Sequence, residues 1–231
     1  MTVSIRLEHV EHEYGGTEES SQVHALSNVD LALAAGDFAI LMGPSGSGKS
    51  TLLNLIGAVD RPTSGRILIG DTDIAGLSED ALTLFRRTSV GFIFQFFNLV
   101  PTLTVRENIG FPLALAGMRR KELDSRTGEI LEGIGLQHRA GHYPNQLSGG
   151  EMQRVAIGRA IVHRPAVLLA DEPTGNLDSR TGETVLELIR SVHRSYRPTI
   201  VMATHSERAA SYGDYIRHVI DGRVLNEGPA E

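Results

Sequence analysis

The stretch Gly43-Pro-Ser-Gly-Ser-Gly-Lys-Ser50 decides the fold of this chain, because it matches the pattern G-x-x-x-x-G-K-[ST] at every fixed position. Glycines let the backbone turn its N–H groups inward around a phosphate, and a following helix presents its N-terminus to the same charge. The apolar residues 37–42 predict a short strand before the loop, and residues 49–59 predict a helix after it. This context separates a phosphate-binding loop from a Gly- and Ser-rich linker that matches by chance. On its own, the motif is compatible with a kinase, a GTPase, a helicase or a transporter subunit.

The loop also carries two side chains that a bound nucleoside triphosphate needs. Lys49 is placed to reach the β- and γ-phosphates, and the Ser50 hydroxyl is placed to be a magnesium ligand. The nucleotide-binding residues predicted in the loop and the first turn of its helix are Gly43, Pro44, Ser45, Gly46, Ser47, Gly48, Lys49, Ser50 and Thr51.

Composition and charge restrict the other functions open to the chain. The net charge is -6, with 22 basic against 28 acidic residues, which gives no general attraction to nucleic acid or anionic lipid. The absence of cysteine excludes disulfides, thiolate metal sites and a cysteine nucleophile. The N-terminus lacks the apolar core of a signal peptide, and no stretch approaches the roughly 20 apolar residues that span a bilayer. We therefore expect any membrane role to come through a partner.

Two carboxylates follow the apolar run 167–170, which predicts a strand buried on both faces of a parallel sheet. A second such run, 199–204, follows a helical pattern, so the pair forms a β-α-β unit. Ligands of a doubly wound sheet bind at the carboxyl ends of its strands. At that edge Asp171 is suited to hold magnesium and Glu172 to polarise an attacking water. The alternative is an acidic pair that only faces solvent.

The rest of the chain predicts an α/β core with a helical insert and an antiparallel edge. Alternation at Ile5, Leu7 and His9 predicts a half-buried strand, and the polar residues 15–22 predict a loop. Further predictions are a strand at 67–69, a helix capped by Ser78, mostly helical structure over 102–160, and a hairpin of 215–220 and 223–225 around Asp221-Gly222.

The stretch Leu147-Ser-Gly-Gly-Glu-Met-Gln-Arg154 predicts a second helix that begins at a glycine-rich motif. Ser148 is a good N-cap residue, and the adjacent glycines let backbone N–H groups approach an anion. One phosphate loop already serves one nucleotide, so a second such start makes sense for a nucleotide held by another copy. Spacing alone leaves open a simpler interpretation, a capped helix after a turn.

With these motifs in place, the chain resembles the ABC ATPase family over about residues 3–226. Residues 147–160 resemble the family signature, with Glu151 where Gln is more common. The other motifs follow in the family order, at Tyr14 (the A-loop), Gln95 (the Q-loop), Gly175-Asn-Leu-Asp178 (the D-loop) and His205 (the switch histidine).

The resemblance implies a role for each of these residues. Tyr14 would stack on adenine, and Gln95 would contact magnesium or the attacking water. His205 would contact the γ-phosphate and hold the attacking geometry with Glu172, so the implied catalytic residues are Glu172, His205 and Gln95, and the implied magnesium ligands are Ser50, Gln95 and Asp171. Residues implied to serve the nucleotide across a dimer are Ser148, Gly149, Gly150 and, in the loop that couples the two sites, Asp178.

The resemblance also implies the fold and the partners. The fold class is α/β, a P-loop NTPase with a RecA-like parallel-sheet core, an antiparallel β subdomain and a helical signature subdomain. One ATPase domain is expected over residues 1–231, with the helical part inserted at about 96–160. ATP and Mg²⁺ are the expected ligands. The expected partners are a second copy of the chain and an integral-membrane permease, and the expected location is the inner face of the cell membrane. A DNA-maintenance ATPase of the family would need a long coiled-coil insertion between the phosphate loop and the signature, and a translation factor would need two ATPase domains in one chain. A catalytically dead regulatory subunit would not keep Lys49, Glu172 and His205.

The segment 92–108 is unusually aromatic for a chain with 5% aromatic residues. Two interpretations stay open, a docking surface for a permease near Gln95–Glu107 and plain core packing. FQFFNLVPTLTVREN, YPNQLSGG and LADEPTGNLDS resemble the lipoprotein-releasing, macrolide-export and FtsE-type subgroup, whose permeases have few membrane helices. ATPases of amino-acid importers share much of the pattern but usually differ around the Q-loop.

Overall fold

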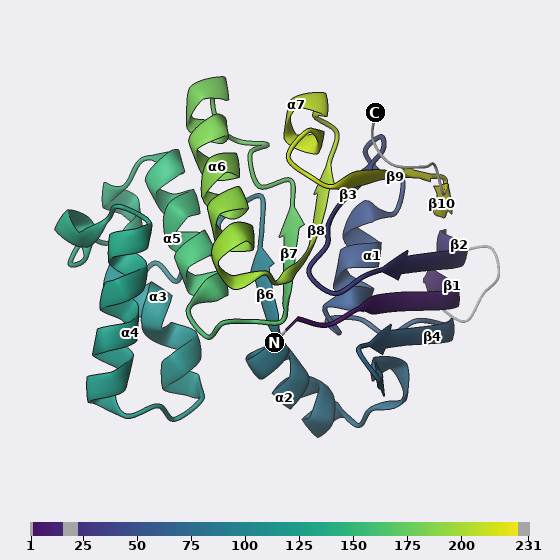
Figure 1. Cartoon of the computed structure of the whole chain (residues 1–231), viewed down its shortest axis with the longest axis horizontal. Helices are drawn as coiled ribbons and strands as arrows, with labels where there is room; N and C mark the ends of the chain where they lie inside the picture. Colours follow the sequence, from purple (N-terminus) through teal and green to yellow (C-terminus); the bar gives the residue numbers. More distant parts are fainter. Residues whose placement is uncertain (1, 16–22, 226–231) are drawn as a thin grey trace.

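Two β-sheets and one group of helices make up the chain (Figure 1). The computed structural model describes residues 2–15 and 23–225, so the predicted loop 15–22 lies almost wholly outside the described residues. In Figure 1 the helices α3, α4 and α5 lie on the left, the strands β6 to β8 in the middle, and the strands β1, β2 and β4 on the right. This arrangement matches the predicted fold class of a P-loop NTPase.

The central sheet has six strands in the order β10-β9-β3-β8-β7-β6, and every neighbouring pair is parallel except β10 with β9. Its strands are β3 (Phe38–Met42), β6 (Val90–Ile93), β7 (Val167–Asp171), β8 (Thr199–Thr204), β9 (Tyr215–Ile220) and β10 (Arg223–Leu225). Successive side chains point to opposite faces, so Ile40 packs in one hydrophobic core and Leu41 in the other. The predicted parallel strands at 167–170 and 199–204 are confirmed.

The second sheet is antiparallel, with the order β2-β1-β4-β5. Its strands are β1 (Ile5–Tyr14), β2 (Val23–Leu33), β4 (Ser64–Ile69) and β5 (Thr72–Asp73). The half-buried first strand is confirmed, but the inward position predicted for His9 is wrong. The register against β2 shifts between Leu7 and Val10, and His9 takes a positive φ of 49° and is exposed. The bulge changes the phase of the alternation, so Val10 and His12 face the core instead.

The helices are α1 (Lys49–Ile56), α2 (Glu79–Ser89), α3 (Val105–Leu115), α4 (Arg120–Gly133), α5 (Gly149–Ile161), α6 (Ser179–Tyr196) and α7 (Glu207–Ala210), with the short 3₁₀ turns η2 (Ile74–Gly76), η3 (Gln137–Arg139) and η4 (Pro144–Gln146). The N-cap at Ser78 is confirmed, because its hydroxyl accepts from the Ala81 N–H at 3.3 Å. The first helix ends earlier than predicted, since Ala58 adopts a positive φ of 54° and cannot continue it.

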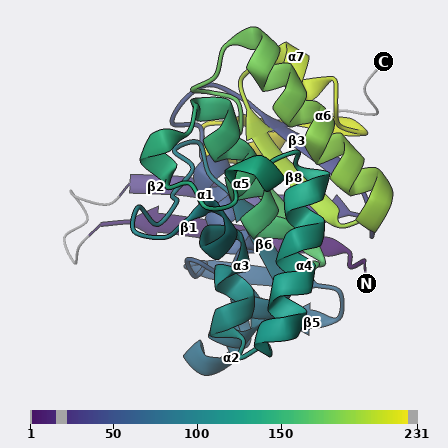
Figure 2. The same ribbon diagram turned by 90° about the vertical axis from the view of Figure 1, so that its left-hand side faces the viewer.

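Helices α3, α4 and α5 account for most of the predicted helical stretch, and Figure 2 looks onto this group with α3 and α4 nearest the viewer. Helix α3 packs on both α4 and α5, while α5 also packs on β6 and α6 and so joins the group to the central sheet. The predicted hairpin around Asp221-Gly222 is confirmed, with positive φ at both residues. Its turn supports the phosphate loop, because the Gly222 N–H donates to the Ser47 carbonyl at 3.0 Å.

Candidate nucleotide-binding site

A cavity of about 680 Å³ opens where the strands β3, β7 and β8 end. It is lined by Tyr14, Val23, His24, Ala25, Ser45, Gly46, Gly48, Lys49, Ser50, Thr51, Gln95, Asp171, Glu172 and His205. The structure therefore brings the phosphate loop, the acidic pair, Gln95, His205 and Tyr14 to one place from five segments of the chain. Carboxyl ends of adjacent parallel strands produce this convergence, as expected for an α/β sheet.

The phosphate loop is held open around the start of α1. Gly48 is the N-cap residue of α1 at φ 105°, and a Cβ there would lie 2.7 Å from the Ala25 carbonyl oxygen, so only glycine fits. No side chain caps this helix, which leaves the N–H groups of its first turn for an anion. Lys49 is 6% exposed, and its Nζ donates to the carbonyls of Gly43 at 2.7 Å and Pro44 at 2.8 Å. The loop thus fixes the ammonium group beside the predicted phosphate position.

Asp171 and Ser50 lie together at the cavity floor, where the Ser50 side chain hydrogen-bonds the Asp171 carboxylate. Burial raises the pKa of Asp171, while the hydrogen bond from Ser50 and the charge of Lys49 oppose that rise. A hydroxyl and a carboxylate beside a phosphate loop are the oxygen ligands that Mg²⁺ prefers. Gln95, whose amide oxygen could serve as a further ligand, lines the same cavity. These residues fit a magnesium ion.

Glu172 and His205 form a pair at the cavity mouth, with His205 Nδ1 and Glu172 Oε1 2.8 Å apart. The Glu172 side chain is 16% exposed and the His205 side chain 69% exposed. Glu172 has a positive φ of 44°, and its N–H donates to the Ala203 carbonyl at 3.0 Å. Non-glycine residues in this conformation persist where the surroundings hold them, often at functional sites. In this conformation the carboxylate is hydrogen-bonded to the imidazole and lines the cavity.

Tyr14 forms the outer wall of the cavity at the end of β1. Its hydroxyl donates to Thr51 Oγ1 at 3.4 Å, and its ring packs edge-on to the buried His12 at 4.5 Å between ring centroids. A ring that is 41% exposed and supported from below suits a stacking platform for a base. Val23, His24 and Ala25 of β2 line the same wall. Sequence reasoning missed these three because they belong to no motif and only the strand pairing brings them here.

The predicted signature residues Ser148, Gly149 and Gly150 and the loop residue Asp178 lie outside this cavity. Asp178 caps α6 by accepting from the N–H groups of Arg180 and Thr181, both at 3.1 Å. Hydrogen bonds from the Thr181 hydroxyl and N–H lower the pKa of the Asp178 carboxyl. It lines a smaller cavity of about 190 Å³ together with Glu172 and His205. The predicted site residues that do not line the cavity of about 680 Å³ are therefore Gly43, Pro44, Ser47, Ser148, Gly149, Gly150 and Asp178.

The start of α5 is closed by a reciprocal pair of hydrogen bonds, a capping box. Ser148 Oγ accepts from the Glu151 N–H at 3.3 Å, and Glu151 Oε2 accepts from the Ser148 N–H at 2.8 Å. Glu151 also pairs with Arg139 at 3.1 Å. The Ser148 N–H and Arg139 lower the pKa of Glu151, so the glutamate that departs from the family pattern has a local structural role.

The aromatic segment divides between the two interpretations that the sequence left open. The rings of Phe92 and Phe94 stack at 4.2 Å between centroids, and Phe92 packs against the hydrophobic core. Phe96, by contrast, is 72% exposed. Core packing therefore explains the beginning of the segment, and Phe96 stands outside it.

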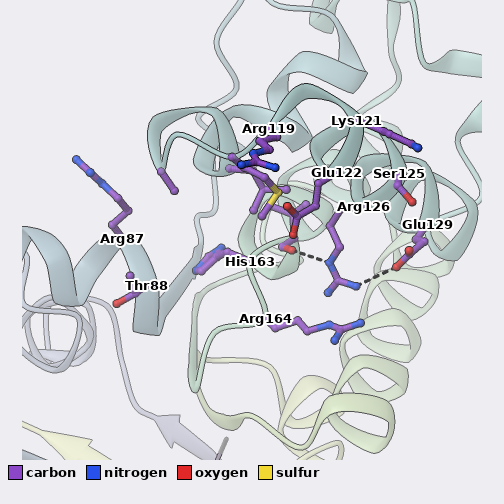
Figure 3. A pocket seen from close by; sticks show the side chains of 14 residues that line it. Arg87, Thr88, Arg119, Lys121, Glu122, Ser125, Arg126, Glu129, His163 and Arg164 are labelled. Atoms are coloured by element: carbon purple, nitrogen blue, oxygen red, sulfur yellow. Dashed lines mark hydrogen bonds and ion pairs between the residues drawn. The ribbon is translucent and has the colours of Figure 1, made fainter.

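A larger cavity of about 820 Å³ lies between the end of α2, the α3–α4 connection and the end of α5 (Figure 3). Its lining includes the cationic Arg87, Arg119, Lys121 and Arg164 above an apolar floor. Arg126 bridges two of its walls, donating to the Val162 carbonyl at 3.0 Å and to Glu129 at 2.9 Å. None of the predicted site residues belongs to this lining, and it contains no glycine loop. The cavity of about 680 Å³ that contains the phosphate loop is therefore the candidate nucleotide site.

Comparisons with known proteins agree with this geometry. Residues 26–175 match the family model described as ABC transporter. The lipoprotein-releasing system ATP-binding protein LolD of Geobacter metallireducens is 47% identical over 212 residues, which cover 92% of this chain and 93% of that protein. The dimeric structure of the ABC transporter cassette MJ0796 from Methanocaldococcus jannaschii has a TM-score of 0.89 and 43% identity, covering 97% of this chain and 98% of that one. A dimeric post-hydrolysis state of that cassette, bound to ADP and Pi, has a TM-score of 0.89 at 42% identity, again with 97% and 98% covered.

Proposed function

The chain belongs to the ABC transporter family as an ATP-binding and ATP-hydrolysing subunit, and we propose that two copies close on ATP to drive a separate membrane permease. One observation carries the proposal. A single copy gathers its phosphate loop, acidic pair and His205 in one cavity, while its own signature start lies outside that cavity. A site that lacks one component in each copy is completed when two copies meet. The dimeric structures of the similar cassette support this arrangement.

Within one copy, each residue has a role that follows from its position. Lys49 and the loop N–H groups bind the phosphates, and Tyr14 stacks on the base. Glu172 orients and polarises the attacking water, while His205, bonded to Glu172 at 2.8 Å, holds the carboxylate and contacts the γ-phosphate. The second copy brings Ser148, Gly149 and Gly150 to the same phosphate, and Asp178 lies in the loop that joins the two sites.

Magnesium would be held by Ser50, Asp171 and Gln95, directly or through water. When bound, it neutralises charge on the β- and γ-phosphates. Burial raises the pKa of the Asp171 carboxyl, so protons compete with the metal at Asp171 to a higher pH than at an exposed aspartate.

The branch we propose is the lipoprotein-releasing type of export ATPase, as in the similar protein LolD. Residues 1–231 then form one ATPase domain whose helical part spans about residues 96–160. No helix in residues 2–15 and 23–225 is long and apolar enough to cross a bilayer. The permease therefore supplies the membrane spans, with few helices and an external domain, and holds the ATPase at the inner face of the cell membrane. Its docking surface is the segment Gln95–Glu107, where Phe96 stands exposed.

Glu172→Gln tests the dimer mechanism. The amide keeps the shape of the side chain but cannot accept a proton from water, so we expect ATP to bind and hydrolysis to fall by a factor of about 10² to 10⁴. The trapped ATP should hold two copies together, and size-exclusion chromatography with ATP should show a dimer. A variant that stays monomeric with ATP and hydrolyses at the normal rate contradicts the role of Glu172.

Phe96→Asp tests the docking surface, and the measurement is co-purification with the integral-membrane protein that the wild-type chain retains. We expect the variant to lose the permease and to keep the ATP affinity of the free chain. Arg119→Glu, in the larger cavity of Figure 3, is the comparison. Loss of the permease with Arg119→Glu but not with Phe96→Asp would place docking in that cavity and overturn the assignment to Gln95–Glu107.

A further inference from the structure

Arg159, in the last turn of α5, holds the backbone just beyond Gln95. Its Nη1 donates to the Asn98 carbonyl at 2.6 Å and its Nη2 to the Phe97 carbonyl at 2.9 Å. Burial lowers the pKa of this guanidinium, and no carboxylate among the described residues forms an ion pair with it. A largely buried cation that bonds two successive carbonyls, with no acidic partner, serves to hold a backbone conformation.

The conformation that Arg159 holds is unusual at one of its two residues. Phe97 lies in the left-handed region at φ 60°, which is uncommon for a bulky residue, and Asn98 follows at φ 47°, which asparagine tolerates. The turn sends neighbouring side chains in different directions. Phe96 is 72% exposed, whereas Phe97 faces the signature, since a Cβ on Gly149 would lie 3.8 Å from its Cζ. One tight turn thus joins the exposed docking residue to the start of α5.

Gln153, also on α5, holds the backbone on the other side of Gln95. It is fully buried, and its Nε2 donates to the Phe94 carbonyl at 3.4 Å and to the Pro173 carbonyl at 2.7 Å. Pro173 directly follows Glu172. The helix that begins with the signature therefore bonds the chain before and after Gln95 and the chain next to Glu172.

We propose that Arg159 is a positioning residue for ATP hydrolysis, which locks the turn after Gln95 so that Gln95 and the start of α5 move as one body. The inference rests on the proposed function, because it takes Gln95 as a residue that contacts magnesium or the attacking water. A displacement of Phe96 by a docked permease then reaches Gln95 and the signature together. Without Arg159 the left-handed turn relaxes, and Gln95 loses its fixed place in the nucleotide cavity.

A double-mutant cycle on the purified full chain tests this. Arg159→Met keeps the aliphatic stem and removes both donors, and we expect kcat to fall about tenfold, because small misplacements of a catalytic group have effects of this size. The KM for ATP should change by less than about twofold, since the phosphate loop is untouched. Gln95→Ala should lower kcat to a similar extent. Because Arg159 acts through Gln95, the double variant should be no slower than the slower single variant.

The matched control is Arg126→Met, since Arg126 also donates from a partly buried position to a backbone carbonyl, that of Val162 at 3.0 Å. It should lower the melting temperature and leave kcat unchanged. If Arg159→Met does not fold, Arg159→Lys carries the test, and we expect an intermediate kcat because an ammonium cannot replace the planar fork. Multiplied losses in the double variant, or an unchanged kcat in Arg159→Lys and Arg159→Met, would overturn this inference alone. An unchanged kcat in Gln95→Ala would overturn the role of Gln95 in the proposed function.

Discussion

Two helices of this chain begin at glycine-rich motifs, and their starts differ in how the backbone N–H groups are used. Helix α1 begins at Gly48, which has no side chain to cap it, so the first turn is open to a phosphate. Helix α5 begins at Ser148, whose capping box with Glu151 satisfies two N–H groups within the chain. The first start lines the nucleotide cavity of its own chain and the second does not.

In the proposed dimer, this difference in capping matches a difference in how each glycine-rich helix start is used. An uncapped start has donors to spare, and it binds its ligand within one chain. A capped start is stable without a ligand, so it can stay exposed in the single chain and contact a nucleotide only when another copy binds. We therefore assign binding affinity mainly to α1 and the dependence of hydrolysis on the dimer to α5.

Lys49→Ala is expected to have the largest effect on this comparison. It removes the ammonium that the carbonyls of Gly43 and Pro44 hold in place, so the phosphates lose their buried positive charge. We expect ATP binding, measured by calorimetry, to weaken by at least about a hundredfold and hydrolysis to vanish, as for other buried electrostatic contacts to phosphate.

Ser148→Ala is the matched change at the other helix start. It should leave the ATP affinity of the single chain unchanged and lower hydrolysis only, because in the proposed dimer Ser148 serves the partner's nucleotide. Equal ATP affinity in the wild type and Lys49→Ala, or lost affinity in Ser148→Ala, would contradict the division between the two starts.

Gly150→Ala is expected to have an intermediate effect, through packing. A Cβ at Gly150 would lie 2.3 Å from Thr181 Cγ2, so the start of α5 must move away from the start of α6. Thr181 is β-branched and stiff in a helix, and the overpacking should cost about 1–3 kcal/mol of unfolding free energy. We expect a lower kcat with nearly unchanged ATP binding. Thr181→Ser removes the clashing methyl, so the double variant should recover both the unfolding free energy and kcat. An absence of recovery would show that the clash is not the cause.

Much of the fold and the cavity was predictable because the signals were local. The phosphate loop, the acidic pair after a buried run, the Ser78 and Ser148 caps and the Asp221-Gly222 turn each depend on residues within a few positions of one another. The convergence of strand ends then followed from the rules of parallel sheets.

The remaining features depend on contacts between distant residues and on unusual backbone angles. Arg159 contacts Phe97 and Asn98, which lie more than sixty positions away along the chain, and no glycine marks the left-handed conformation of Phe97. The positive φ of Glu172 has no local signal, and a histidine at position 9 does not by itself predict a β-bulge. The backbone conformation at such positions is set by contacts with residues that are distant in the sequence.

Glu151→Gln is expected to have the smallest effect, and it tests the cap alone. Glutamine at this position still accepts from the Ser148 N–H, so the capping box survives, while the ion pair with Arg139 is lost. We expect the unfolding free energy to fall by at most about 0.5 kcal/mol at neutral pH and hydrolysis to stay unchanged.

The pH dependence of stability tests the same pair. The Ser148 N–H and Arg139 lower the pKa of Glu151 in the folded chain. Its carboxylate therefore stabilises the fold above the ordinary glutamate pKa of about 4.3, and this contribution is lost as the pH falls through the lowered pKa. The melting temperatures of the two proteins should therefore differ slightly at pH 7 and converge below about pH 4. A difference that grows in acid, or a large loss of ATPase activity, would mean that Glu151 acts on the nucleotide and that the second helix start is not simply a capped platform.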